Sequence, residues 1–121
     1  MQDIIKVIIK DPEDKAREKT MINATKEFQY EVGGLFKLVY LDAIDGIVMI
    51  VNKERNLKEL GLNFPLGDGF VVGTAVFVGG TKCKKGVEFR GLTDEEIQTV
   101  YNVIEGDKHY KNLKILIEEN Q

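Results

Sequence analysis

Short runs of β-branched and apolar residues, separated by turn signals, recur along most of the chain and are typical of a protein rich in β-strands. Residues 4–10 predict a first strand, because isoleucine and valine dominate the run and the turn signal Asp11-Pro12 directly follows it. Residues 17–22 predict a second, weaker strand. The pattern therefore indicates two strands at the start of the sequence.

A hairpin is indicated near the middle of the sequence. Residues 35–41 and 47–52 are apolar runs that flank Asp45-Gly46, a pair that favours hairpin turns because both positions tolerate positive φ. We expect one face of the hairpin to belong to the core and the other to be mixed. The expected core face carries Phe36, Leu38 and Tyr40.

The longest apolar run predicts a central strand. Residues 70–78 carry no charge and indicate one strand buried on both faces, with Gly73 as a bulge or a close backbone approach. The turn-rich residues 61–69 before it predict an irregular loop. We expect the glycine pair at 79–80 to end the strand, and residues 86–90 to return as its short antiparallel partner.

Apolar residues at spacings of three and four predict a first helix. Asn23 is the expected N-cap of this two-turn helix, which should end at Gly33-Gly34. Its expected buried stripe contains Ala24, Phe28, Val32 and Leu35. Residues 56–60 predict one further helical turn.

A complete helix start lies at residues 92–97. Thr93 can accept a bond from the N3 amide, Glu96 can return one to the N-cap, and Leu92 can pack on Ile97. The helix should end at Gly106. Its expected buried stripe contains Ile97, Val100, Tyr101 and Ile104.

The last residues, 110–120, fit both a helix and a strand. Leu113, Leu116 and Ile117 have helical spacing, whereas Leu113, Ile115 and Ile117 alternate as in a strand, and we favour the helix. All the elements together predict the α+β class, with two to three helices packed on one face of a mainly antiparallel sheet. We expect a single domain over residues 1–121.

Composition agrees with one globular domain. The 121 residues are 43% hydrophobic and 31% charged. The net charge of −3 disfavours nonspecific binding to nucleic acid. No export signal or long apolar run is visible, so we expect a soluble protein of the bacterial cytoplasm with no membrane contact. Cys83 is the only cysteine, which excludes an internal disulfide.

No constellation of residues indicates catalysis. Cys83 has lysine neighbours and is a candidate reactive thiol, although a partly exposed loop cysteine is the simpler interpretation. His109 has no ligand or nucleophile nearby in sequence. Gly67-x-Gly69 resembles a phosphate loop, but it precedes a strand and does not open a helix. We therefore expect no catalytic residue, no metal and no cofactor.

Two surfaces are candidates for binding. The first is the loop after residue 52, where amides, cations and an aromatic ring could form a polar ligand site. Its candidate residues are Asn52, Lys53, Arg55, Asn63 and Phe64. The second is a basic hairpin, for which a solvated turn is the simpler interpretation. Its candidate residues are Lys82, Lys84, Lys85 and Arg90.

Several stretches resemble the domain of unknown function family 3846, a family of short proteins from phages and mobile elements of gut bacteria. These stretches are residues 32–40, 52–54 with 61–63, 72–79 and 92–97. The resemblance covers residues 3–106 and leaves 107–121 as a C-terminal extension. The family's loop has a glycine and an arginine where Arg55-Asn56 and Phe64 stand here. The resemblance implies no known enzyme activity.

The genomic setting that the resemblance implies suggests two hypotheses. The first is a non-enzymatic accessory protein, such as a counter-defence protein, that binds a host protein or sequesters a small nucleotide-like anion. The second is a nucleic-acid-binding regulator or a small enzyme that uses the basic hairpin. A homodimer is compatible with both.

Overall fold

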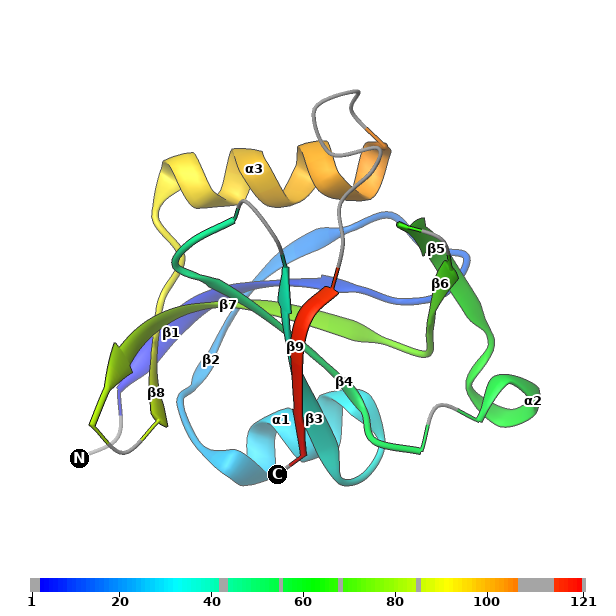
Figure 1. Ribbon diagram of the computed structural model, residues 1–121, viewed down its shortest axis with the longest axis horizontal. Helices are drawn as coiled ribbons and strands as arrows, with labels where there is room; N and C mark the ends of the chain where they lie inside the picture. The colour runs from blue at the N-terminus through cyan, green and yellow to red at the C-terminus, as the bar shows by residue number, and fades with distance from the viewer. Residues whose placement is uncertain are drawn as a thin grey trace.

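The computed structural model describes residues 3–41, 44–54, 56–67, 69–84, 86–106 and 115–120, with the backbone alone for residues 82, 83 and 115–120 (Figure 1). The elements are β1 Ile4–Lys10, β2 Arg17–Ile22, α1 Thr25–Val32, β3 Phe36–Leu41, β4 Ile47–Asn52, α2 Leu57–Leu60, β5 Leu62–Leu66, β6 Gly69–Val72, β7 Ala75–Cys83, β8 Gly86–Arg90, α3 Asp94–Glu105 and β9 Ile115–Asn120.

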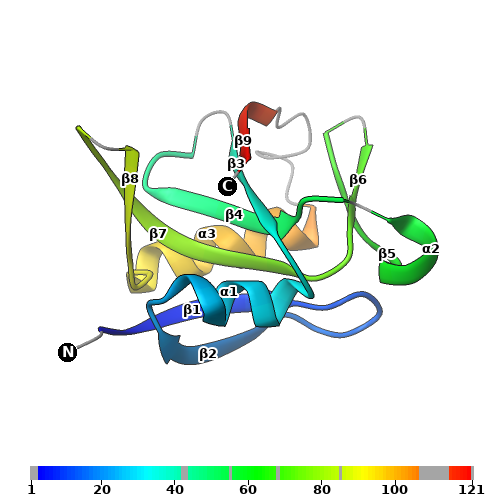
Figure 2. The ribbon, with the colours of Figure 1, turned by 90° about the horizontal axis from the view of Figure 1, so that it is seen from below.

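One twisted antiparallel sheet forms the frame of the protein. Its strands lie in the order β2-β1-β7-β4-β3-β9, and β8 pairs with the far half of β7. Strands β5 and β6 form a separate two-stranded sheet, which we call the arm together with α2. The arm extends at the right-hand end of the molecule in Figures 1 and 2. The mainly antiparallel sheet and its helices confirm the predicted α+β class.

The sheet is buried on both faces. Along β7, Ala75 and Phe77 belong to one apolar cluster, while Val76 and Val78 belong to another. Helix α3 covers the first cluster with residues such as Val100, and α1 covers the second cluster. The two helices therefore lie on opposite sides of the sheet (Figure 1). The expectation that the helices share one face is wrong, because the central strands β4 and β7 are apolar at consecutive positions, and a strand that is apolar on both faces requires a cover on each.

The same double burial changes the interpretation of the β3–β4 hairpin. The hairpin is confirmed, with Tyr40 opposite Val48. However, its second face is core as well, since Val39 and Leu41 are only 2% and 3% exposed. Positive φ occurs at Gly46, whereas Asp45 does not adopt it.

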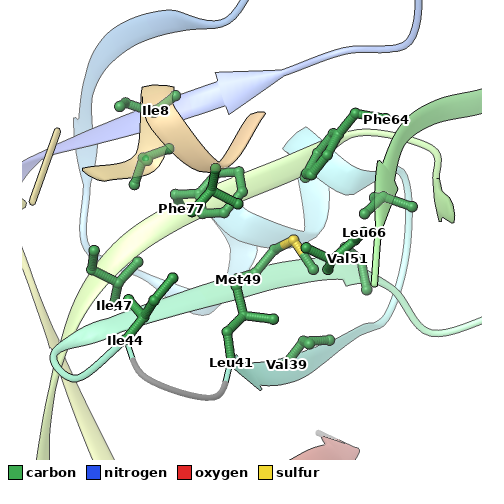
Figure 3. Packing of buried hydrophobic residues seen from close by; sticks show 14 of the residues in the cluster. Ile8, Val39, Leu41, Ile44, Ile47, Met49, Val51, Phe64, Leu66 and Phe77 are labelled. Atoms are coloured by element: carbon green, nitrogen blue, oxygen red, sulfur yellow. The ribbon is translucent and has the colours of Figure 1, made fainter. Parts of the chain in front are cut away.

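The arm is built into the cluster below α3. Phe64 and Leu66 are buried there together with residues of β4 and β7 (Figure 3), and Val71 belongs to the same cluster. The ring of Phe64 lies against that of Phe77, with 6.1 Å between ring centroids. The inner side of the arm is therefore a part of the core.

The expected irregular loop and single long strand are both wrong. Most of residues 61–69 form β5 and the turn into β6, and the apolar run 70–78 divides into β6 and β7. The division lies at Gly73, where φ is +77° and a Cβ would approach Leu60 Cβ to 3.1 Å. Only glycine fits this reversal without strain. Strand β7 then continues through the glycine pair at 79–80, which was expected to end it.

The helix boundaries largely match the sequence patterns. Helix α1 ends at Gly33 as expected, but its N-cap is Ala24 and has no side-chain bond. Asn23 instead donates a hydrogen bond to the Phe89 carbonyl at 3.0 Å, so its expected capping role is wrong. Asn56 does cap the short α2.

The end of the chain is a strand where we favoured a helix. Strand β9 pairs antiparallel with β3, from Lys37 opposite Asn120 to Leu41 opposite Ile115. Pairing explains the choice, because β3 would otherwise expose the backbone groups of its outer edge. Residues 110–114, which belong to the same expected helix, lie outside the described residues.

The capping box of α3 is confirmed and gives a stability prediction. Thr93 accepts from Glu96 N at 3.2 Å, and Glu96 accepts from Thr93 N at 2.9 Å. We expect Thr93→Ala to lower the free energy of unfolding by about 1 kcal/mol, because the substitution leaves a helix amide without its acceptor. A urea titration measures this loss. Thr93→Ser should retain most of the stability, and an unchanged midpoint for Thr93→Ala would contradict the capping role.

Candidate functional site

The first predicted site residues lie at a shallow hollow where β4 ends. The hollow has a volume of about 340 Å³ and is lined by Gly33, Gly34, Leu35, Asn52, Lys53 and Glu54. The hollow therefore lies where the end of α1, the start of β3 and the end of β4 meet. Two stretches that carry the family resemblance come together here.

Asn52 holds this corner of the fold together. Its side chain is 6% exposed and donates to the Val32 carbonyl at 3.1 Å, at the C-terminus of α1. Its side-chain oxygen accepts from the amide of Glu54 at 2.8 Å. Lys53 is exposed, and its backbone amide donates to Leu35 at 2.8 Å. Lys53 thus offers its ammonium group to solvent, while Asn52 ties a helix end to a strand end.

Asn63 joins the arm to the main sheet. Its side-chain nitrogen donates to the carbonyls of Lys10 and Gly73, each at 2.7 Å. Its oxygen accepts from Lys10 Nζ at 2.9 Å. Both N–H groups of this amide are therefore used within the fold.

The predicted loop site is only partly assembled. Asn52 and Lys53 line one hollow, whereas Asn63 lies at the arm joint and Phe64 is buried in the core at 5% exposure. Arg55 lies outside the described residues. In this arrangement the Phe64 ring packs on Phe77 and presents no stacking face to solvent.

A charged network extends the joint around Asn63. Asp11 accepts from Thr74 Oγ1 at 2.6 Å and from Arg17 at 2.7 Å. Burial alone would raise the pKa of the Asp11 carboxyl, but these hydrogen bonds, with the charges of Arg17 and Lys10, outweigh it and hold the pKa below its ordinary value. The network stabilises the turn after β1.

Arg90, a candidate of the basic hairpin, is occupied by an ion pair. Its guanidinium donates to both carboxylate oxygens of Glu96, at 2.7 and 2.9 Å. It also donates to the carbonyls of Gly46 and Gly91, at 3.3 and 3.1 Å. At Gly46, φ is +82° and a Cβ would lie 2.8 Å from Glu96 Oε2, so the close approach requires glycine. Arg90 thus joins β8, α3 and the β3–β4 turn.

The remaining basic candidates lie at the β7–β8 hairpin. Lys84 is exposed. Lys85 and the side chain of Lys82 lie outside the described residues. An open hollow of about 500 Å³ lies beside this hairpin, between β8 and the start of β1, and it is lined by Ile4, Glu88, Phe89 and Arg90 among others. Because both a carboxylate and a guanidinium line it, the hollow has mixed charge.

The sequence patterns missed the outer side of the arm. Leu57, Leu62 and Phe70 are exposed by 54%, 47% and 51% of their surface. Pro65, also exposed, stands opposite Phe70 in the β5–β6 pairing. Residues 70–72 are all apolar, so no signal in the sequence indicated the alternation in burial between the exposed Phe70 and the buried Val71.

Among the described residues, no group of three or more His, Cys, Asp or Glu side chains could hold a metal ion. None of the described helices is long and apolar enough to span a membrane. A family model for a domain of unknown function (DUF3846) matches residues 5–105, which agrees with the resemblance seen in the sequence. No curated protein and no solved structure matches the chain.

The Arg90–Glu96 pair predicts a pH dependence of stability. Hydrogen bonds from Arg90 hold the pKa of Glu96 below its ordinary value against the opposing effect of burial. Because the pKa of Glu96 is lower in the folded state, the ion pair makes its full contribution to the free energy of unfolding above the unfolded-state pKa of about 4.5. This contribution is lost as the pH falls through the folded-state pKa.

We expect Glu96→Gln to cost about 1 kcal/mol at pH 7, a modest value because Arg90 is 38% exposed and solvent screens the pair. The loss should shrink as pH falls below about 4.5. Denaturant titrations at pH 7 and pH 3 check this. Glu95→Gln is the matched control, since its exposed side chain lies in the same helical turn. Equal losses for Glu96→Gln at both pH values would contradict the account.

The bonds of Asn63 predict a structural loss on substitution. We expect Asn63→Ala to lower the free energy of unfolding by about 2 kcal/mol, because the carbonyls of Lys10 and Gly73 lose their donor. Asn102→Ala is the control, since the Asn102 side chain accepts one exposed bond from Gln98. Thermal unfolding of both variants measures the difference. An Asn63→Ala midpoint equal to that of the control would show that the joint contributes nothing.

Proposed function

Since this chain belongs to the DUF3846 family of unknown function, its surface is the guide to its role, and we propose that it is a non-enzymatic protein that binds a protein partner through the outer side of the arm. The occupant of this surface is an apolar patch on another protein. The proposed setting is the cytoplasm of a bacterium, where a phage or mobile-element accessory protein of this kind would occlude a host defence protein.

One observation supports this proposal above the others. Three large apolar side chains of the arm, Leu57 of α2, Leu62 of β5 and Phe70 of β6, are about half exposed. Phe70 stands opposite the exposed Pro65, so apolar surface is shared between the two strands. Grouped exposed apolar residues that include an aromatic ring are typical of protein interfaces.

The anchoring of the arm supports the same role. Its inner side chains Phe64, Leu66 and Val71 are buried in the core, and Asn63 ties it to β1. An arm held in this way presents its outer side in one conformation. Binding then costs less ordering entropy than binding by a loop.

The polar groups give less support to a small anion or a nucleic acid as the ligand. Asn63 and Arg90 use their donors within the fold, and Phe64 is buried. The net charge of −3 also opposes both ligands. Lys53 and Lys84 remain exposed, and the experiment below therefore distinguishes these alternatives.

The test compares captured partners of matched variants. Tagged wild-type protein, Leu62→Gln/Phe70→Gln and Tyr30→Gln are used to isolate complexes from a bacterial lysate, with native mass spectrometry of each complex. Tyr30, on α1, is 79% exposed and provides an apolar control away from the arm. We expect the arm variant to lose one stoichiometric polypeptide that the wild type and Tyr30→Gln both retain.

The arm substitutions should leave the thermal midpoint nearly unchanged, because exposed side chains usually contribute less than about 0.5 kcal/mol. A partner retained in full by the arm variant would contradict the proposal. A stoichiometric small anion or nucleic acid in place of a polypeptide would also contradict it, and Lys53→Gln and Lys84→Gln would then identify the surface involved.

A further inference from the structure

The outer edge of β3 holds a strand that lies beyond the family-matched part of the chain. Strand β3 pairs with β4 on one side and with β9 on the other. The family match ends at residue 105, before β9 begins at Ile115. Among the described strands, β9 pairs with β3 alone, and Figure 1 shows it alongside β3 at the front of the molecule. The matched region therefore has β3 as its edge strand.

The β3 edge is suited to receiving an added strand. Its ladder with β9 runs from Lys37 opposite Asn120 to Leu41 opposite Ile115, with one irregularity after Tyr40. Without β9, the outward backbone groups of β3 would have no ladder partner. An open edge of this kind next to buried residues such as Val39 and Leu41 favours capture of an extended segment.

We propose that the β3 edge is an interaction site for a second copy of this chain. Strand β9 of the second copy pairs with β3 in the same register and takes the place of the chain's own β9. In the resulting dimer each chain donates β9 to the β3 edge of its partner, so both edges are filled by one two-fold operation. This proposal is independent of the role of the arm.

A second copy fits this edge better than an unrelated strand for a physical reason. The exchanged dimer contains the same β3–β9 pairings as the monomer, so exchange keeps the ladder and changes only which chain supplies the strand. Nine peptide units connect Gly106 to Ile115, and a connection of this length spans at most about 30 Å when extended. Protein concentration then sets the balance between the two forms.

Paired cysteines across the ladder test the exchange directly. Leu38 stands opposite Glu119, and Cα atoms of directly opposite antiparallel residues lie about 4.5–5.5 Å apart, which a disulfide can bridge. In a Cys83→Ser background, Leu38→Cys protein is mixed with Glu119→Cys protein, unfolded in urea, refolded together at several concentrations and oxidised. We expect the mass to shift from 13.7 kDa to twice that value on a non-reducing gel, increasingly so at higher concentration.

Two controls decide the outcome. The first control mixes Leu38→Cys protein with Glu118→Cys protein. Position 118 is one residue away from the partner of Leu38, so its thiol lies on the opposite face of the sheet and much less linked dimer should form. Leu38→Cys/Glu119→Cys in one chain, at high dilution, should form an internal bond. If this internal bond forms while the mixture stays monomeric at every concentration, the proposal is wrong. Absence of both bonds would also overturn it, because β9 would then not occupy the β3 edge at all.

Discussion

Strand β7 carries alternate side chains into two separate apolar clusters, and the positions of the other elements follow from this double burial. Phe77 points toward the cluster under α3, and Val76 and Val78 belong to the cluster under α1. A sheet with two apolar faces must be covered twice. Helix α3 with the arm covers one face, and α1 covers the other (Figures 1 and 2).

Polar side chains hold in place the elements that lie at the margins of the two apolar clusters. Arg90 and Glu96 join the β8 edge to the start of α3, while Asn63 joins the arm to the end of β1. Asn52 joins α1 to β4. Asn52, Asn63 and Arg90 were candidate ligand-binding residues in the sequence, because stabilising a fold and binding a ligand use the same amides and cations. Their partners within the chain explain them without a ligand.

Features set by neighbouring residues could be predicted from the sequence, and features set by distant partners could not. The capping box at Thr93 is correct because all its determinants lie within a few residues. The structural bonds of Asn63 could not be predicted, because the carbonyl of Lys10 that it binds is 53 residues away. The apolar run 70–78 looked uniform, although the backbone reversal at Gly73 depends on contact with Leu60. The strand β9 depends on the open edge of β3, which the local pattern of its own residues does not reveal.

The central claim is that the arm belongs to the core and is held in one conformation while its outer side stays exposed. Native-state hydrogen exchange followed by NMR tests this claim most directly, because it reports the opening free energy of each amide. The account predicts that the slowest amides of β5 and β6 open only in transitions close in free energy to those of β7. Rapid exchange throughout β5 and β6, with β7 still protected, would show that the arm opens separately and would contradict the account.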